Sequence, residues 1–117
     1  MQSSALGLDS RTVNFSRDVI AFCKMEPLTT VTRPLIDQLI RCATSVGANY
    51  AEANNAASRT DFKNKIFIAK KEAAEAKYWL ILMSDVVFDK AMCERLTQDC
   101  QYLLMTLHKI ISTMNHK

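Results

Sequence analysis

The chain has 117 residues, enough for one domain with a substantial core, and we expect a single domain over residues 1–117. Hydrophobic residues make up 49% of the chain and charged residues 23%, with only two glycines and two prolines. This composition excludes a disordered chain and a turn-rich β-sandwich, and it favours an all-α globular protein. The formal net charge of +3 permits an anionic partner but does not require one.

The N-terminal segment MQSSALGLDS has neither a basic start nor an apolar stretch of the kind that directs export. The longest apolar run in the expected helices, Tyr78 to Met83, is six residues, far below the roughly 20 that a membrane-spanning helix needs. We therefore expect a cytoplasmic protein that does not enter the membrane, with residues 1–9 forming a loose arm.

The first two helices are delimited by proline and threonine signals. The first is predicted from Ser10 to Met25, because Pro27 disfavours helical geometry in the residue before it and lacks an amide hydrogen. Thr32 is a plausible N-cap for the second, which reaches Asn54. The apolar positions expected to form the core faces of these helices are Val13, Phe15, Val19, Ile20, Phe22 and Cys23, then Ile36, Leu39, Ile40, Ala43, Val46, Gly47, Tyr50 and Ala51.

The third and fourth helices show long, regular apolar stripes. Ser58, with Asp61 three residues later, resembles a capping box for the third helix, and Asp89 can cap the fourth. Steps of three and four follow without a miss, which is typical of the seam of an antiparallel bundle. We therefore predict an up-down-up-down four-helix bundle, whose third and fourth seams are Phe62, Ile66, Ala69, Ala73, Ala76, Leu80, Met83 and Val87, then Cys93, Leu96, Cys100, Leu103, Leu107, Ile110 and Met114.

A stripe of small residues marks the second helix. Ala43, Gly47 and Ala51 are four residues apart and line one side with almost no side chain, which lets another helix approach closely. Glycine inside a helix lowers helix stability by about 1 kcal/mol relative to alanine. Its presence at position 47 therefore indicates a close helix contact that compensates for this loss. We interpret the stripe as a packing groove and expect the alanines of the third helix to face it.

The third helix is also apolar around its whole circumference near its end. A helix of this kind is buried on all sides, yet four helices cannot enclose one of their own members. Scattered apolar surface residues are normal, but four within five positions favour an interface with another subunit. The residues expected to form this oligomer interface are Tyr78, Trp79, Ile81 and Leu82.

Residues with catalytic or ligating chemistry are sparse. The four cysteines, at 23, 42, 93 and 100, match no metal-ligand spacing and lie on apolar stripes, so we expect free buried thiols. His108 and His116 show no metal-binding spacing either, and we expect Glu52, Glu72 and Glu75 to pair with Arg41, Lys70 or Lys71. No phosphate loop or nucleophile motif is found, so we predict no cofactor, no metal and no enzymatic activity.

A line of basic residues is the one electrostatic pattern with a functional interpretation. Arg59, Lys63, Lys70 and Lys77 are four, seven and seven residues apart, which places them roughly along one line of the third helix. A solvated face or intersubunit salt bridges would explain such a run in most proteins. Binding of a nucleic-acid backbone is the sharper alternative.

Several motifs resemble one bacterial protein family. TSVGANYAEA at Thr44 to Ala53, preceded by QLIRCATS and followed by SRTDF and IAKKEAAEAKYWL, is similar to the four-helix-bundle proteins encoded by intervening sequences in 23S ribosomal RNA genes. Relatives include the accessory variability determinant of diversity-generating retroelements, a basic pentameric bundle that associates with nucleic acid and a reverse transcriptase. The resemblance implies a homopentamer with RNA or DNA as a partner. The chain departs from many relatives at Ala51 and Asn55, where those carry arginine.

Two functions therefore remain open at the level of the sequence. One is a nucleic-acid-binding accessory protein that acts as an oligomer. The other is a structural oligomer that scaffolds a protein partner without touching nucleic acid.

Overall fold

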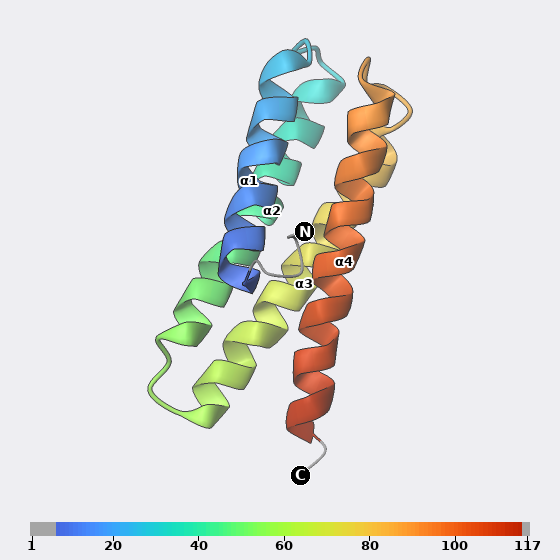
Figure 1. The fold of residues 1–117 in the computed structure, drawn as a ribbon. Coiled ribbons are helices and arrows are strands. Elements are labelled where there is room, and N and C mark those ends of the chain that lie inside the picture. Colours follow the sequence, from blue (N-terminus) through green and yellow to red (C-terminus); the bar gives the residue numbers. More distant parts are fainter. Residues whose placement is uncertain (1–6, 116–117) are drawn as a thin grey trace.

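The computed structural model describes residues 7–115, and it shows four helices in an antiparallel up-down-up-down bundle (Figure 1). The helices are α1 (Leu8–Met25), α2 (Thr32–Asn54), α3 (Arg59–Met83) and α4 (Lys90–Asn115). The predicted all-α fold class is confirmed. No helix in this part of the chain has both the length and the hydropathy needed to cross a membrane.

The helices contact one another around a closed ring, α1 with α2, α2 with α3, α3 with α4 and α4 with α1. The contact between α2 and α3 is the most extensive and that between α1 and α4 the least. Three alanines on the seam of α3, Ala69, Ala73 and Ala76, are fully buried, so this helix can lie close to its neighbours. The largest fully buried side chains are Leu39, Ile66, Leu80, Met83, Leu96 and Leu107.

The starts of α3 and α4 are capped as predicted. The Ser58 hydroxyl accepts a hydrogen bond from the Asp61 amide at 3.0 Å, and the Asp89 carboxylate accepts one from the Met92 amide at 3.0 Å. Each cap satisfies one of the amide groups that a helix start leaves without a partner.

The cap of α2 lies earlier than predicted. The hydroxyl of Thr29, not of Thr32, accepts hydrogen bonds from the amides of Val31 and Thr32, at 3.2 and 3.0 Å. Thr32 reciprocates, since its hydroxyl accepts from the Thr29 amide at 2.9 Å and donates to the Pro27 carbonyl at 2.7 Å. The pair forms a reciprocal cap in which threonine replaces the usual glutamate, so the prediction of Thr32 as the N-cap was wrong.

The two ends of α1 differ in how well they were predicted. Pro27 ends the helix as expected, because Glu26 adopts extended geometry with φ −92° and ψ 138°. The start was placed too late, since α1 already includes Leu8 and Asp9 and the expected loose arm of residues 1–9 does not extend that far. The rest of that arm, residues 1–6, lies outside the described residues.

The seam of α3 does not continue to Val87. The helix ends at Met83, and a turn returns the chain so that Val87 is buried from the linker instead. Lys90 stabilises this turn by donating to the carbonyls of Ser84 at 2.9 Å and Val87 at 3.3 Å. Val87 has the four-residue spacing of the seam, but it lies beyond the end of α3 and therefore not on a face of that helix.

Four other core assignments need correction. Val13 and Ile20 of α1 are exposed, because they are seven residues apart on the outer side of the helix with Arg17 between them. On α4 the last fully buried residue is Ile111, whereas Ile110 and Met114 are half-buried. The stripe of α4 thus shifts by one residue in its last two turns.

A buried carboxylate joins the two linkers at one end of the bundle. Glu26 is only 6% exposed, and its two oxygens accept hydrogen bonds from the amides of Phe88 at 3.0 Å and Asp89 at 3.1 Å. The linker after α1 is therefore held to the start of α4 by charge-assisted bonds. Nothing in the periodicity of the sequence indicated this contact.

Candidate nucleic-acid interface

The four basic residues of the predicted line lie on the edge of α3 that faces α4. Each donates a hydrogen bond to a group on α4, and from Lys63 to Lys77 the acceptors follow the antiparallel order of the two helices. Over 18 residues at about 1.5 Å per residue, the line is roughly 27 Å long. The pairs from one end to the other are Arg59 with the Met114 carbonyl, Lys63 with Asn115, Lys70 with His108, and Lys77 with Gln101.

The acceptors on α4 are neutral groups, which leaves the positive charges of the basic line uncompensated. Lys70 donates to Nδ1 of His108 at 2.9 Å, and Lys77 donates to the Gln101 amide oxygen at 2.7 Å. Within residues 7–115 none of the four forms a salt bridge. The bonds to α4 orient the side chains while their charge stays available to an anion.

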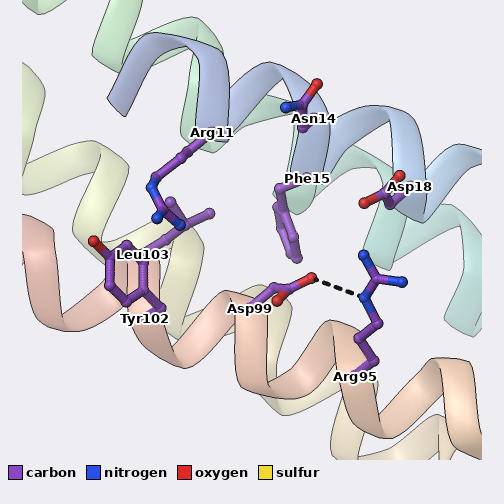
Figure 2. Close-up of a pocket in the computed structure, with 8 residues that line it drawn as sticks. All are labelled: Arg11, Asn14, Phe15, Asp18, Arg95, Asp99, Tyr102 and Leu103. Atoms are coloured by element: carbon purple, nitrogen blue, oxygen red, sulfur yellow. Dashed lines mark ion pairs between the residues drawn. The ribbon is translucent and has the colours of Figure 1, made fainter. Parts of the chain in front are cut away.

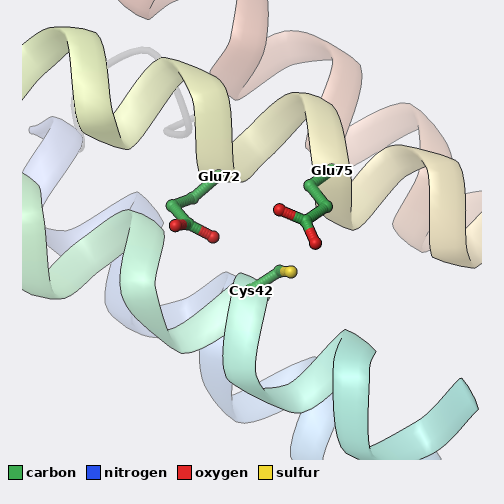
Figure 3. A group of neighbouring side chains, drawn as sticks. All are labelled: Cys42, Glu72 and Glu75. Atoms are coloured by element: carbon green, nitrogen blue, oxygen red, sulfur yellow. The ribbon is translucent and has the colours of Figure 1, made fainter. Parts of the chain in front are cut away.

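The acidic side chains of α3 point the other way. Glu72 and Glu75 project toward α2 and converge on Cys42 (Figure 3). Of the predicted ion pairs, Glu75 with Arg41 is present at 3.9 Å, but Lys70 lies on the opposite edge of the helix. Glu52 pairs instead with Lys65, at 2.8 Å. Helix α3 therefore has a basic edge along α4 and an acidic edge along α2.

The outward surface of α3 carries several exposed apolar side chains, with the exposed Lys71 among them. Of the predicted interface residues, Tyr78 is 55% exposed, Ile81 50% and Leu82 38%. Trp79 is only half-buried by its neighbours, and it contacts Tyr78 edge to face at 5.1 Å between ring centroids. Burying this surface would require a partner outside the chain.

Two residues of this apolar face were missed by the sequence analysis. Phe67 is 47% exposed and Ile68 36%, and both lie on the exposed surface of α3. Phe67 precedes Tyr78 by 11 residues, three helical turns, so it continues the same stripe. Its spacing could have revealed it, but Phe67 lies outside the uninterrupted apolar run that begins at Tyr78. We call the exposed set Phe67, Ile68, Tyr78, Ile81 and Leu82 the outer face of α3.

The small stripe of α2 faces α1 rather than α3. A Cβ added to Gly47 would lie 3.2 Å from the Thr12 side chain of α1, and the Ala43 carbonyl accepts a bond from Ser16 at 3.3 Å. Ala43 is buried, Gly47 half-buried and Ala51 exposed. The prediction that the alanines of α3 face this stripe was wrong at Gly47, which contacts α1 instead.

A pocket lies between α1 and α4, the two neighbouring helices with the least extensive contact. Eight residues line this pocket, which has a volume of about 410 Å³ (Figure 2). The guanidinium of Arg11 stacks 4.2 Å from the ring centroid of Tyr102, and Arg95 pairs with Asp99 at 3.9 Å. Burial raises the pKa of the Asp99 carboxyl, and the charge of the nearby Arg95 lowers it by a smaller amount. With Asp18 also in the lining, acidic and basic groups balance, so this pocket does not select an anion.

The four cysteines are free and buried, as predicted. Burial raises the pKa of Cys23, Cys42 and Cys100 to about 12 each, and it also raises that of Cys93. The thiols are therefore protonated at neutral pH and are poor nucleophiles. Two of them donate to carbonyls of α3, Cys93 to Leu80 at 3.3 Å and Cys100 to Ala73 at 3.1 Å.

Residues 8–109 match the model of the 23S rRNA-intervening sequence protein family. The chain belongs to this family. A crystal structure from Bacteroides thetaiotaomicron VPI-5482, of a protein with unknown function from the S23 ribosomal protein family, is similar at 31% identity and a TM-score of 0.78. The match covers 90% of this chain and 98% of that one. No curated protein matches the chain.

The motifs from which the family was predicted lie within the matched residues. The stretches TSVGANYAEA and IAKKEAAEAKYWL lie on α2 and α3, the two helices with the most extensive contact. Kinship with the accessory variability determinant stays a prediction.

Proposed function

We propose that this protein is an oligomeric accessory protein that binds the phosphate backbone of RNA or DNA through the basic line of α3. One observation carries the proposal, namely that Arg59, Lys63, Lys70 and Lys77 are held on neutral acceptors of α4. The nearby carboxylates of α3 are turned toward α2, which removes the main electrostatic objection to an anionic ligand.

Assembly strengthens the binding in this proposal. One subunit offers three or four phosphate contacts, too few for firm binding at physiological salt. Copies joined through the outer face of α3 repeat the line, and contacts on one strand then gain from a high effective concentration. No aromatic residue lies on the line itself, so we expect little base stacking and little sequence preference.

Fluorescence anisotropy with labelled single-stranded RNA and duplex DNA tests the proposal. Wild type should bind at low salt, with affinity falling steeply as salt rises. A triple variant, Lys63→Ala, Lys70→Ala and Lys77→Ala, should lose at least tenfold in affinity and flatten the salt dependence.

The control removes the same charge elsewhere. Arg17, Lys24 and Arg33 are exposed on α1 and α2, away from the line, and their combined replacement by alanine should leave most of the affinity intact. No binding at low salt, or equal losses in the two triple variants, would reject the basic line. The scaffold for a protein partner would then be the better interpretation of the exposed outer face.

A further inference from the structure

A thiol and two carboxylates converge between α2 and α3, on the edge opposite the basic line. Cys42 projects from α2, and Glu72 and Glu75 project from successive turns of α3 (Figure 3). Their ligand atoms all lie within 4.8 Å of one another. Residues three apart on a helix share a face, so the backbone alone directs both carboxylates toward the same space.

The polar groups of this cluster are incompletely satisfied by the protein. Oε1 of Glu72 is buried and has no hydrogen-bond partner among the described residues. Glu75 is better placed, since Oε2 accepts a long bond of 3.4 Å from the Trp79 indole and lies 3.9 Å from the Arg41 guanidinium. A buried carboxylate oxygen without a donor is unfavourable, and the site therefore lacks a positive partner at Glu72.

We propose that Cys42, Glu72 and Glu75 form a binding site for a divalent cation of the zinc class. Sulfur ligation excludes magnesium and calcium, which take oxygen ligands, whereas zinc accepts thiolate and carboxylate together. Zinc bonds of about 2.0–2.3 Å require ligand atoms roughly 3.5 Å apart, a contraction within reach of side-chain rotation. The Cys42 thiol gives up its proton to solvent on binding, and three protein ligands leave a fourth position for water.

Cobalt(II) reports on this site directly, because a cobalt–thiolate bond absorbs in the near ultraviolet and zinc has no such band. The full chain, freed of metal with a chelator and kept reduced, is titrated with CoCl₂ and then with ZnCl₂. One equivalent of cobalt should produce the charge-transfer band, zinc should abolish it, and zinc should raise the melting temperature.

Variants assign the band to the cluster. Cys42→Ser should lose it, whereas Cys93→Ser, which alters an equally buried thiol outside the cluster, should keep it. Glu72→Gln preserves the shape of the side chain and should weaken cobalt binding at least tenfold, with unchanged helical circular dichroism. Absence of the band in wild type, its persistence in Cys42→Ser, or unchanged affinity in Glu72→Gln would each overturn the proposal. None of these outcomes depends on nucleic-acid binding, since the two sites lie on opposite edges of α3.

Discussion

At the residue scale, the buried thiols should make the stability of the bundle fall as the pH rises into the alkaline range. Their pKa values are raised in the folded protein, to about 12 for Cys23, Cys42 and Cys100, chiefly because burial disfavours the thiolate. The thiol of a cysteine in an unfolded chain has a pKa of about 8.5. The folded state thus holds its protons over a range of pH in which the unfolded state releases them.

We predict that the thiol contribution to the free energy of unfolding is fully present below about pH 8.5 and is lost as the pH rises toward 12. Urea unfolding between pH 8 and 11 measures this loss. Cys100→Ala removes one of the thiols with a raised pKa, so its stability should decline less steeply with pH than that of wild type. Identical slopes for both proteins would show that other groups, such as lysines, account for the decline.

At the element scale, the packing of α2 against α1 depends on one glycine. Thr12 of α1 lies where a side chain at Gly47 would project, and it is 2% exposed with its hydroxyl bonded to the Asp9 carbonyl at 2.9 Å. The nearest atom is Cβ of Thr12, which is fixed to the α1 backbone and cannot rotate away. A large side chain at position 47 must therefore displace α1.

We predict that Gly47→Leu destabilises the protein by about 1–3 kcal/mol through overpacking against α1. Ala51→Leu is the matched control, since it lies one helical turn further on the same stripe but is exposed. This change should alter stability by no more than about 0.5 kcal/mol. Urea titrations of both variants give the comparison, and an equal cost at the two positions would contradict the contact between α1 and α2 described here.

At the scale of the whole molecule, α3 presents three surfaces with different chemistry. One edge is basic, the opposite edge carries the two glutamates, and the surface between them carries the apolar side chains of the outer face together with Lys71. An odd-numbered ring such as a pentamer needs heterologous contacts, in which two different patches meet. We propose the outer face of α3 as one such patch.

We predict that the protein is an oligomer, five subunits being the number that its family resemblance implies. Sedimentation equilibrium should give a mass several times 13.2 kDa. Tyr78→Glu places a charge on the outer face at a position that is 55% exposed, so it should shift the mass toward the monomer without unfolding the bundle. A wild type that is monomeric at micromolar concentration would end the proposal of an oligomer.

The same charge change also tests how assembly and binding are linked. If copies of the basic line act together, Tyr78→Glu should weaken nucleic-acid binding although Lys63, Lys70 and Lys77 are intact. Ala21→Glu, at an exposed position of α1, adds the same single negative charge away from the outer face and is the control.

The amino-acid sequence by itself determined the features that depend on local physics. Regular steps of three and four predicted four helices, Pro27 marked the end of α1, and Ser58 and Asp89 marked the starts of α3 and α4. Each signal acts within a few residues, through helix periodicity or through amides left without partners at a helix end. The family followed as well, because its motifs are contiguous in the chain.

Only the tertiary structure decided which surfaces meet. Periodicity gives the angle of a side chain around its own helix, but not the rotation of that helix relative to its neighbours. For this reason the partner of Gly47, the turn of Glu72 toward α2, and the neutral acceptors of the basic line could not be predicted. Cys42 and Glu72 are 30 residues apart in sequence, and only the packing of α2 against α3 brings the thiol and the carboxylate together.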